Sequence, residues 1–230
     1  MLLFAPEGVD LARRRIAGLR NDGAGWRRCE APLPDIAHDM GFYTAPATIR
    51  RVKRIKGPAS PLPFTGYALG HKWRIHQALM RTEFAALLPE TFLLRSPGGA
   101  AAAARRYGAV MVKPRDGKQG RGIVKIRAAG GRFIWQEQHS RAAAMPEAAL
   151  ASRLAARFPP GKALVQRWMD IRCPQGGVFD IRVLMQRTGD GAWRRTAEAV
   201  RQSGVSRIAS NVSGGGAVRE AGPFLAGMYG

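Results

Sequence analysis

Residues 112–125, VKPRDGKQGRGIVK, have the types and spacing best suited to chemistry in this chain. Lys113 ends an apolar run, and Gly117, Gly120 and Gly122 follow with the spacing G-x-x-G-x-G. Glycines permit positive φ angles and close backbone approach, so amide N–H groups can point at phosphate oxygens while Lys113 adds a positive charge. The segment lacks the G-x-x-x-x-G-K-[ST] pattern of a P-loop. A phosphate clamp and a glycine-rich hairpin with solvated charges both explain it.

A second segment, residues 163–170, is an apolar run that ends in polar and aromatic groups. Gln166, Trp168 and Met169 near its end could frame a flat base through stacking and backbone hydrogen bonds. An ordinary core strand is the alternative interpretation.

Two later segments also carry polar groups. Asp180 and Arg182 fall on one face of an expected strand, because side chains alternate with period two, and they indicate a polar cleft or an internal ion pair. Asn211 lies in the glycine-rich stretch 210–216, which suits contacts with anions or with metal-bound phosphate, or forms a flexible turn.

Composition limits the partners. The 230 residues carry a formal net charge of +21 and are 46% hydrophobic, which is typical of a globular protein with an anionic partner. Most of the basic residues are arginines spread along the chain, so nucleic acid is the less favoured partner. Two cysteines are too few for a disulfide scaffold, and no apolar run is long enough to span a membrane. A cytoplasmic location is the default expectation.

The elements that position these residues follow from periodicity and turn residues. Residues 72–81, 100–107 and 146–158 favour helices. Strands are expected at 91–94, 109–113, 122–127, 132–137, 162–168, 178–187 and 193–201. Because helices alternate irregularly with strands that can pair antiparallel, the sequence predicts an α+β fold.

Residues 1–65 form an N-terminal region with a weaker pattern. Asp10 could cap a short helix through Arg20, and residues 47–56 could form a second helix. The Pro/Gly-rich segment 57–63 is the best candidate for a linker to the domain expected over residues 66–230.

Taken in order, the motifs of the second region resemble the ATP-grasp family. The order is a lysine with a glycine loop, an apolar strand with Gln166, Asp-Ile-Arg at 180–182, and Ser-Asn-x-x-Gly-Gly from Ser210. The resemblance is closest to the YheC/YheD-like branch, described as endospore coat-associated, and covers roughly residues 65–218. It implies an ATP site between two α+β subdomains, with the nucleotide between antiparallel sheets.

The resemblance also assigns roles to individual residues. The phosphate-binding lysine and the loop that covers the phosphates are represented by Lys113, Gly117, Gln119, Gly120 and Gly122. The residues that line the adenine are Gln166, Trp168 and Met169. The residues facing the phosphates or the acceptor are Arg182, Arg201 and Asn211, with Asp180 in a polar orienting role. Arg182 and Arg201 would be the catalytic pair, since many members use ATP and Mg²⁺ to activate a carboxylate for attack by an amine.

The sequence departs from the family at its metal site. ATP-grasp enzymes usually hold magnesium with a late Glu-x-Asn pair, and the carboxylates beyond Asp180, namely Asp190, Glu198 and Glu220, form no such pair. With an end at Gly230, we expect a domain that is incomplete at its C-terminal end, a poor ligase, and an exposed sheet edge that favours self-association or a partner. The rival functions are a non-catalytic nucleotide-binding or coat-assembly protein and a basic nucleic-acid-binding module.

Overall fold

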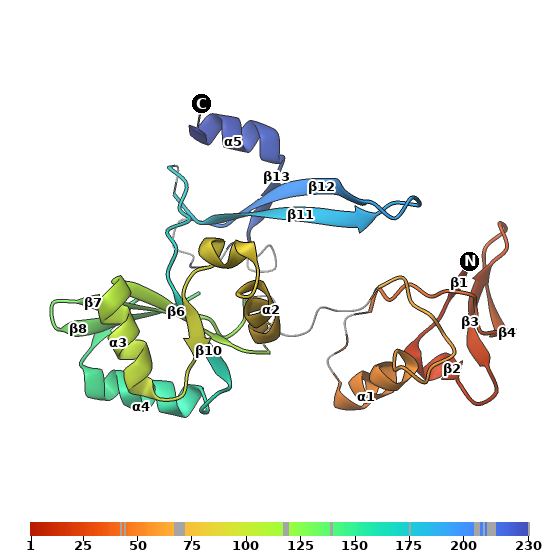
Figure 1. Ribbon diagram of the computed structural model, residues 1–230, viewed down its shortest axis with the longest axis horizontal. Helices are drawn as coiled ribbons and strands as arrows, with labels where there is room; N and C mark the ends of the chain where they lie inside the picture. Colours follow the sequence, from red (N-terminus) through yellow and green to blue (C-terminus); the bar gives the residue numbers. More distant parts are fainter. Residues whose placement is uncertain are drawn as a thin grey trace. The chain divides into compact units, whose positions relative to one another are not determined.

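The computed structural model describes residues 1–41, 43, 45–66, 72–116, 120–138, 140–174, 176–204, 208, 210 and 215–229. The chain divides into two compact units, Met1–Leu69 and Gly70–Gly230 (Figure 1). Each unit has its own core, and the first unit contains one sheet whereas the second contains two. No helix among the described residues has both the length and the apolar character that a membrane crossing requires.

The first unit is a small antiparallel sheet with one helix. Its elements are β1 (Leu2–Leu3), the 3₁₀ turn η1 (Pro6–Gly8), β2 (Val9–Asp10), β3 (Arg15–Asn21), β4 (Trp26–Pro32) and α1 (Pro46–Ile55). Strand β3 pairs with β1, β2 and β4. The helix predicted at residues 47–56 is confirmed as α1. It packs within this unit, because its Ile55 lies in a core with Ile16 and Leu62.

The helix predicted from Asp10 through Arg20 is wrong, because β2 and β3 occupy this stretch. Strand pairing on both sides of β3 outweighs the capping potential of Asp10, whose carboxylate instead accepts a hydrogen bond from the Arg13 amide at a tight turn. The glycine at position 18 lets β3 lie close to the end of β1, because a Cβ there would lie 2.5 Å from the carbonyl oxygen of Leu3. Residues 57–64 also pack in this unit, where Leu62 is buried and Phe64 pairs with Ala37.

The second unit has two sheets with helices, an arrangement that confirms the α+β class. Its larger sheet has the order β5-β10-β6-β7-β8-β9, with every neighbouring pair antiparallel. These strands are β5 (Thr91–Leu93), β6 (Ala109–Pro114), β7 (Val124–Ala129), β8 (Arg132–Glu137), β9 (Ala143–Met145) and β10 (Ala163–Arg167). The helical elements of this part are α2 (Lys72–Leu79), η2 (Glu83–Leu87), α3 (Pro97–Tyr107) and α4 (Glu147–Arg157).

One face of the larger sheet forms the main core with α3 and α4. Val110, Val112 and Val165 point to this side and are fully buried. Helix α3 meets the sheet through small side chains, because Ala100 and Ala104 are fully buried beside it. Glycine 108, with φ +76°, ends the helix and turns the chain directly into β6, as its position in the sequence predicts.

The smaller sheet has the order β11-β12-β13, formed by β11 (Phe179–Arg187), β12 (Trp193–Gln202) and β13 (Ala217–Arg219). The predicted hairpin around residues 188–191 is confirmed by the register of β11 and β12. A terminal helix, α5 (Ala221–Tyr229), follows β13 and was not expected from the sequence. Its Phe224 ring packs 5.3 Å from that of Phe179, centroid to centroid, so α5 covers the beginning of β11.

Candidate functional site

The face of the larger sheet opposite α3 and α4 carries the predicted lysine. The strand register aligns Lys113 with Leu164, and Gln166 with both Met111 and Thr91, so these side chains share one face. Met111 also pairs with Lys125 on β7. We call this the lysine face. Its polar side chains are positioned by strands whose opposite sides hold the core.

A chain of hydrogen bonds orients the Lys113 ammonium group. Lys113 Nζ donates to Gln166 Oε1 at 2.7 Å, Gln166 Nε2 donates to Thr91 Oγ1 at 2.8 Å, and the Thr91 hydroxyl donates to the Pro89 carbonyl oxygen at 2.8 Å. The structure therefore brings together two predicted site residues, Lys113 and Gln166. Thr91 is a third member of the chain that the sequence reasoning missed.

Helix α2 adds two basic side chains to this face. Burial, and then the charge of Lys72, lower the pKa of Lys113 to about 8. Burial, and then the charge of Lys113, also lower the pKa of His76. The pKa of Lys72 is lowered by burial and partly restored by Asp116. Because the charge of Lys72 acts on the Lys113 ammonium, the two positive groups form a site that is suited to an anion with more than one charge.

The bend between β6 and β7 contains the predicted glycines. Gly120 and Gly122 have φ angles of +70° and +72°, in the left-handed region that favours glycine. A Cβ at Gly122 would meet Pro114 Cγ at 3.0 Å, so the chain packs tightly there. Gly117 and Gln119 lie outside the described residues, and their assignment stays a prediction.

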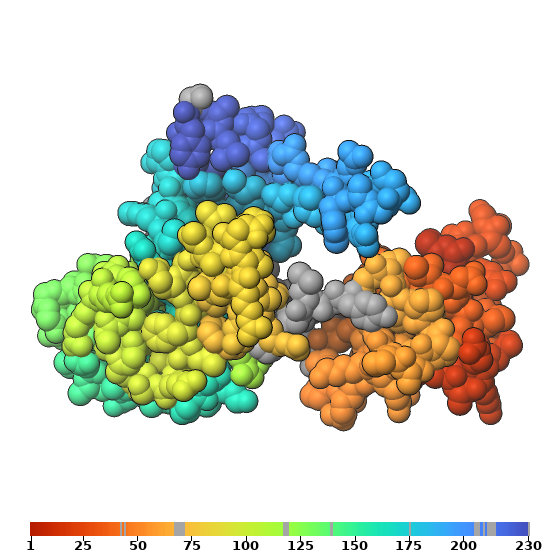
Figure 2. Space-filling view, viewed as in Figure 1, coloured from red at the N-terminus to blue at the C-terminus, as the bar shows by residue number. Residues whose placement is uncertain are grey.

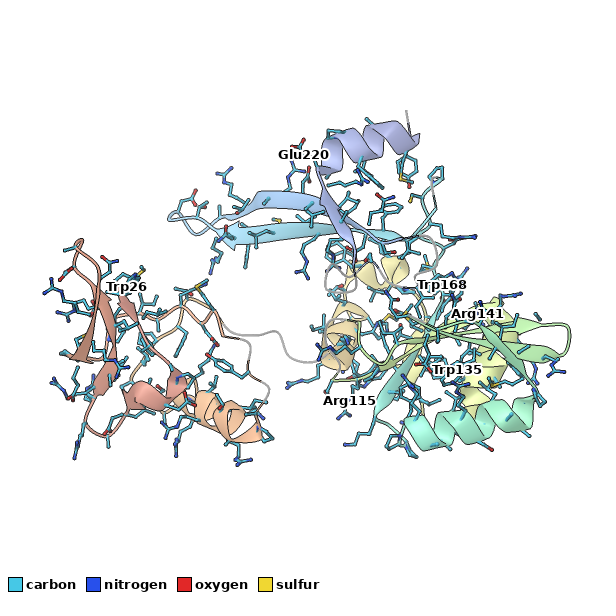
Figure 3. All side chains as sticks on the ribbon, turned by 180° about the vertical axis from the view of Figure 1, so that it is seen from behind. Trp26, Arg115, Trp135, Arg141, Trp168 and Glu220 are labelled. Carbon is cyan, nitrogen blue, oxygen red and sulfur yellow. The ribbon has the colours of Figure 1, made fainter. Side chains whose placement is uncertain are left out.

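Trp168 and Met169 follow the end of β10. The Lys125 ammonium lies 3.8 Å from the centroid of the Trp168 ring, which places Trp168 beside the lysine face. Figure 3 shows Trp168 on the side of the sheet away from α4, and Trp135 on the α4 side. Met169 is 52% exposed. Since Lys125 already covers one face of the indole ring, a base could stack only on its other face or against its edge.

The second group of predicted residues lies on the smaller sheet. Asp180 on β11 accepts two hydrogen bonds from its cross-strand partner Arg201, one of them from Nε at 2.7 Å, and a further one from the Ser210 hydroxyl. Burial raises the pKa of Asp180, but the hydrogen bonds from Arg201 and Ser210 and the charge of Arg182 outweigh it, so the pKa is lowered. Asp180 thus pairs with Arg201, whereas the sequence pattern paired it with Arg182, which is exposed in the structure. Asn211 lies outside the described residues.

The structure assigns no magnesium ligands among the described residues. No group of three or more histidine, cysteine or acidic side chains gathers among them. Asp180, the carboxylate placed closest to the predicted phosphate arginines, already binds Arg201 and Ser210. Because magnesium usually needs only one or two protein carboxylates beside phosphate and water, its ligands stay unassigned.

Comparison with known proteins identifies the family of this chain. Residues 61–230 match the sequence model of the YheC/D-like ATP-grasp family. The chain belongs to this family. Endospore coat-associated protein YheD of Bacillus subtilis (strain 168) is 26% identical over 226 residues, which cover 94% of this chain and 50% of YheD. Endospore coat-associated protein YheC of the same strain is 22% identical over 222 residues, covering 92% of this chain and 61% of YheC. The chain therefore spans about half to three-fifths of these relatives.

Lys72, His76 and Thr91 were not assigned to the site from the sequence. Lys72 and His76 lie one helical turn apart in α2 and therefore share a face of that helix. Thr91 is the first residue of β5. A search for polar residues on the same helical face as Lys72 would have found His76. Thr91 carries no local signal, because only the sheet register brings it to Gln166.

Proposed function

We propose that the second unit binds ATP, with the phosphates at Lys113 and Lys72 and the base towards Gln166, Trp168 and Met169. The observation that carries this proposal is the buried Lys113 ammonium, which Gln166 orients and the charge of Lys72 perturbs, next to the positive-φ glycine bend. A triphosphate would relieve the repulsion between the two ammonium groups. Membership in the ATP-grasp family supports the choice of ATP over other polyanions.

In this proposal the backbone of Gly120 and Gly122 approaches the phosphates, and the predicted Gly117 and Gln119 complete the loop. Arg201 is held in place by Asp180, and together with Arg182 and Asn211 it faces the phosphates or an acceptor carboxylate. Positively charged groups fixed in advance stabilise the charge that spreads over a transferring phosphoryl group. This is the contribution that ligase-like chemistry would require from these residues.

The test is isothermal titration of ATP into the full chain and two lysine variants. Lys113→Met should weaken binding by at least about tenfold, since a hydrogen bond to a charged group contributes roughly 1.5–3 kcal/mol. Lys162→Met is the matched control, because Lys162 is exposed just before β10 and takes no part in the hydrogen-bond chain. Equal ATP affinity in a folded Lys113→Met protein would contradict the proposal.

We infer further that this chain binds ATP but hydrolyses it slowly or not at all. The carboxylates beyond Asp180 include no Glu-x-Asn pair, no group of three or more histidine, cysteine or acidic side chains gathers among the described residues, and phosphoryl transfer relies strongly on magnesium in this class of enzyme. Release of ADP should therefore stay near background with magnesium and a panel of carboxylate acceptors and amines. ADP release that requires both an acceptor and Arg201 would overturn this inference.

A second candidate function is structural: the chain would associate with spore-coat proteins or with further copies of itself. The relatives' names mention the endospore coat. Ile181, Val183 and Met185 share one face of β11 with cross-strand Trp193, and all four are about half exposed or more. Figure 2 shows the β11–β12 hairpin standing out from the body of the second unit. Exposed apolar patches of this kind often mark protein interfaces.

Sedimentation velocity tests this second candidate. The double variant Val183→Lys, Trp193→Ser should lower any self-association of the full chain. Leu87→Ser is the control, because Leu87 is 78% exposed in η2, outside the patch. A monomer at all concentrations would leave coat proteins as the partners to test by co-purification, and equal association of all variants would exclude this patch.

A further inference from the structure

The first unit contains a cavity of about 340 Å³ that the ATP proposal does not use. This volume lies in the range of roughly 300–1,000 Å³ typical of small-molecule sites. The lining of the cavity includes apolar side chains from the N-terminal segment, α1 and the chain before residue 65, namely Leu2, Phe4, Val52, Ile55 and Phe64. It also includes the polar side chains of His38, Asp39, Tyr43 and Lys56. All but Phe64 precede the residues that match the ATP-grasp family.

One end of the cavity carries a fixed pair of opposite charges. Lys56 Nζ lies 2.9 Å from Asp39 Oδ2, and the two side chains are only 15% and 18% exposed. The Tyr43 hydroxyl and the Gly41 amide each donate a hydrogen bond of 3.0 Å to Asp39 Oδ1. Burial raises the pKa of Asp39, but these hydrogen bonds and the charge of Lys56 outweigh it, so the pKa is lowered and the group remains a carboxylate.

Stability alone gives a weak reason for this arrangement. Removing two opposite charges from water costs about as much as their attraction returns, and apolar residues of similar size would fill the wall equally well. A mainly apolar cavity with a few converging polar groups is instead the usual form of a ligand site.

We propose that this cavity binds a zwitterionic amino acid with an apolar side chain. The α-ammonium group would lie beside Asp39, the α-carboxylate beside Lys56, and the side chain among Phe4, Ile55 and Phe64. A ligand with a single charge gains one contact and meets the like charge of the other partner. A zwitterion gains both contacts, and so completes an alternating arrangement of four charges.

The test is titration of the full chain, without ATP, with L-phenylalanine and with two analogues that each lack one charge. We expect saturable binding of L-phenylalanine at concentrations up to about 10 mM, a range that fits a small ligand. Phenethylamine and 3-phenylpropionate should bind at least about tenfold more weakly, because each loses one charged contact. Equal binding of either analogue, or no saturable binding of L-phenylalanine, would overturn the proposal.

Variants locate the binding in this cavity. Asp39→Asn and Lys56→Met should each weaken binding of L-phenylalanine by about tenfold or more. Lys53→Met is the control, because Lys53 lies on the same helix but is exposed. Val52→Phe provides a second approach, since it fills the cavity and leaves both charges in place. Unchanged affinity in a folded Val52→Phe protein would overturn the proposal, whatever the outcome of the ATP titrations.

Discussion

The affinity of the second unit for ATP should depend on pH through Lys113. Burial and the nearby Lys72 lower the pKa of this lysine to about 8, so its charge is lost as the pH rises through that value. From that pKa, about nine-tenths of the molecules carry the ammonium group at pH 7 and about one-tenth at pH 9. Bound phosphates restore the charge, and ATP binding above pH 7 therefore takes up a proton.

The expected magnitude follows from this titration. The dissociation constant for ATP should rise about tenfold between pH 7 and pH 9, or about 1.4 kcal/mol. Phosphate groups titrate near pH ~6 and stay charged over this window. His76, which also faces Lys113, has a pKa lowered first by burial and then by the charge of Lys113, so it is already neutral at pH 7.

Calorimetry in two buffers with different enthalpies of ionisation measures both the affinity and the proton uptake. The pH dependence should disappear in Lys113→Met and persist in the exposed control Lys162→Met. The reasoning is refuted if the affinity stays constant from pH 7 to pH 9. It is also refuted if Lys113→Met retains the same dependence, because the titrating group would then lie elsewhere.

Three further outcomes can be measured. Thr91→Val should weaken ATP binding several-fold, because Gln166 loses its acceptor and Lys113 its fixed partner, while Thr91→Ser should restore the affinity. Gly122→Ala should destabilise the protein by about 1–2 kcal/mol in urea unfolding, because its φ of +72° and its contact with Pro114 both oppose a side chain. The lowered pKa of Asp180 adds stability above its usual pKa that is lost as the pH falls, so the unfolding free energy of Asp180→Asn should change less on acidification than that of the parent.

Local sequence signals predicted most of the second unit. The helices at α2, α3 and α4 and the β11–β12 hairpin were expected because their patterns are regular and are bounded by proline, glycine or a four-residue turn. Helix α5 was missed, since its nine residues include two glycines and a proline and are apolar on all sides. The segment from Asp10 to Arg20 was misread because pairing with β1 and β4 decides its conformation, and such pairing is not visible locally.

The candidate site was predicted only where its residues lie within recognisable motifs. Lys113 and Gln166 belong to two motifs that the sheet brings together, as their 2.7 Å hydrogen bond shows. The sequence indicated a polar cleft or an ion pair for Asp180 and Arg182, but the hairpin register places Arg201 opposite Asp180, and the ion pair forms with Arg201. Contacts between distant segments, such as Thr91 with Gln166, depend on strand order, which no single-sequence pattern specifies.

The alanines of α3 make the lysine face sensitive to changes on the other side of the sheet. Because Ala100 and Ala104 hold the helix against the sheet with methyl groups alone, no free volume remains there for a larger side chain. A substitution such as Ala104→Leu would overpack this layer, at a cost of about 1–3 kcal/mol, and would push α3 away or displace β6. Because β6 carries Lys113, a substitution at a residue that contacts no ligand can change the geometry of the lysine face. Variation at positions 100 and 104 should therefore be confined to small side chains.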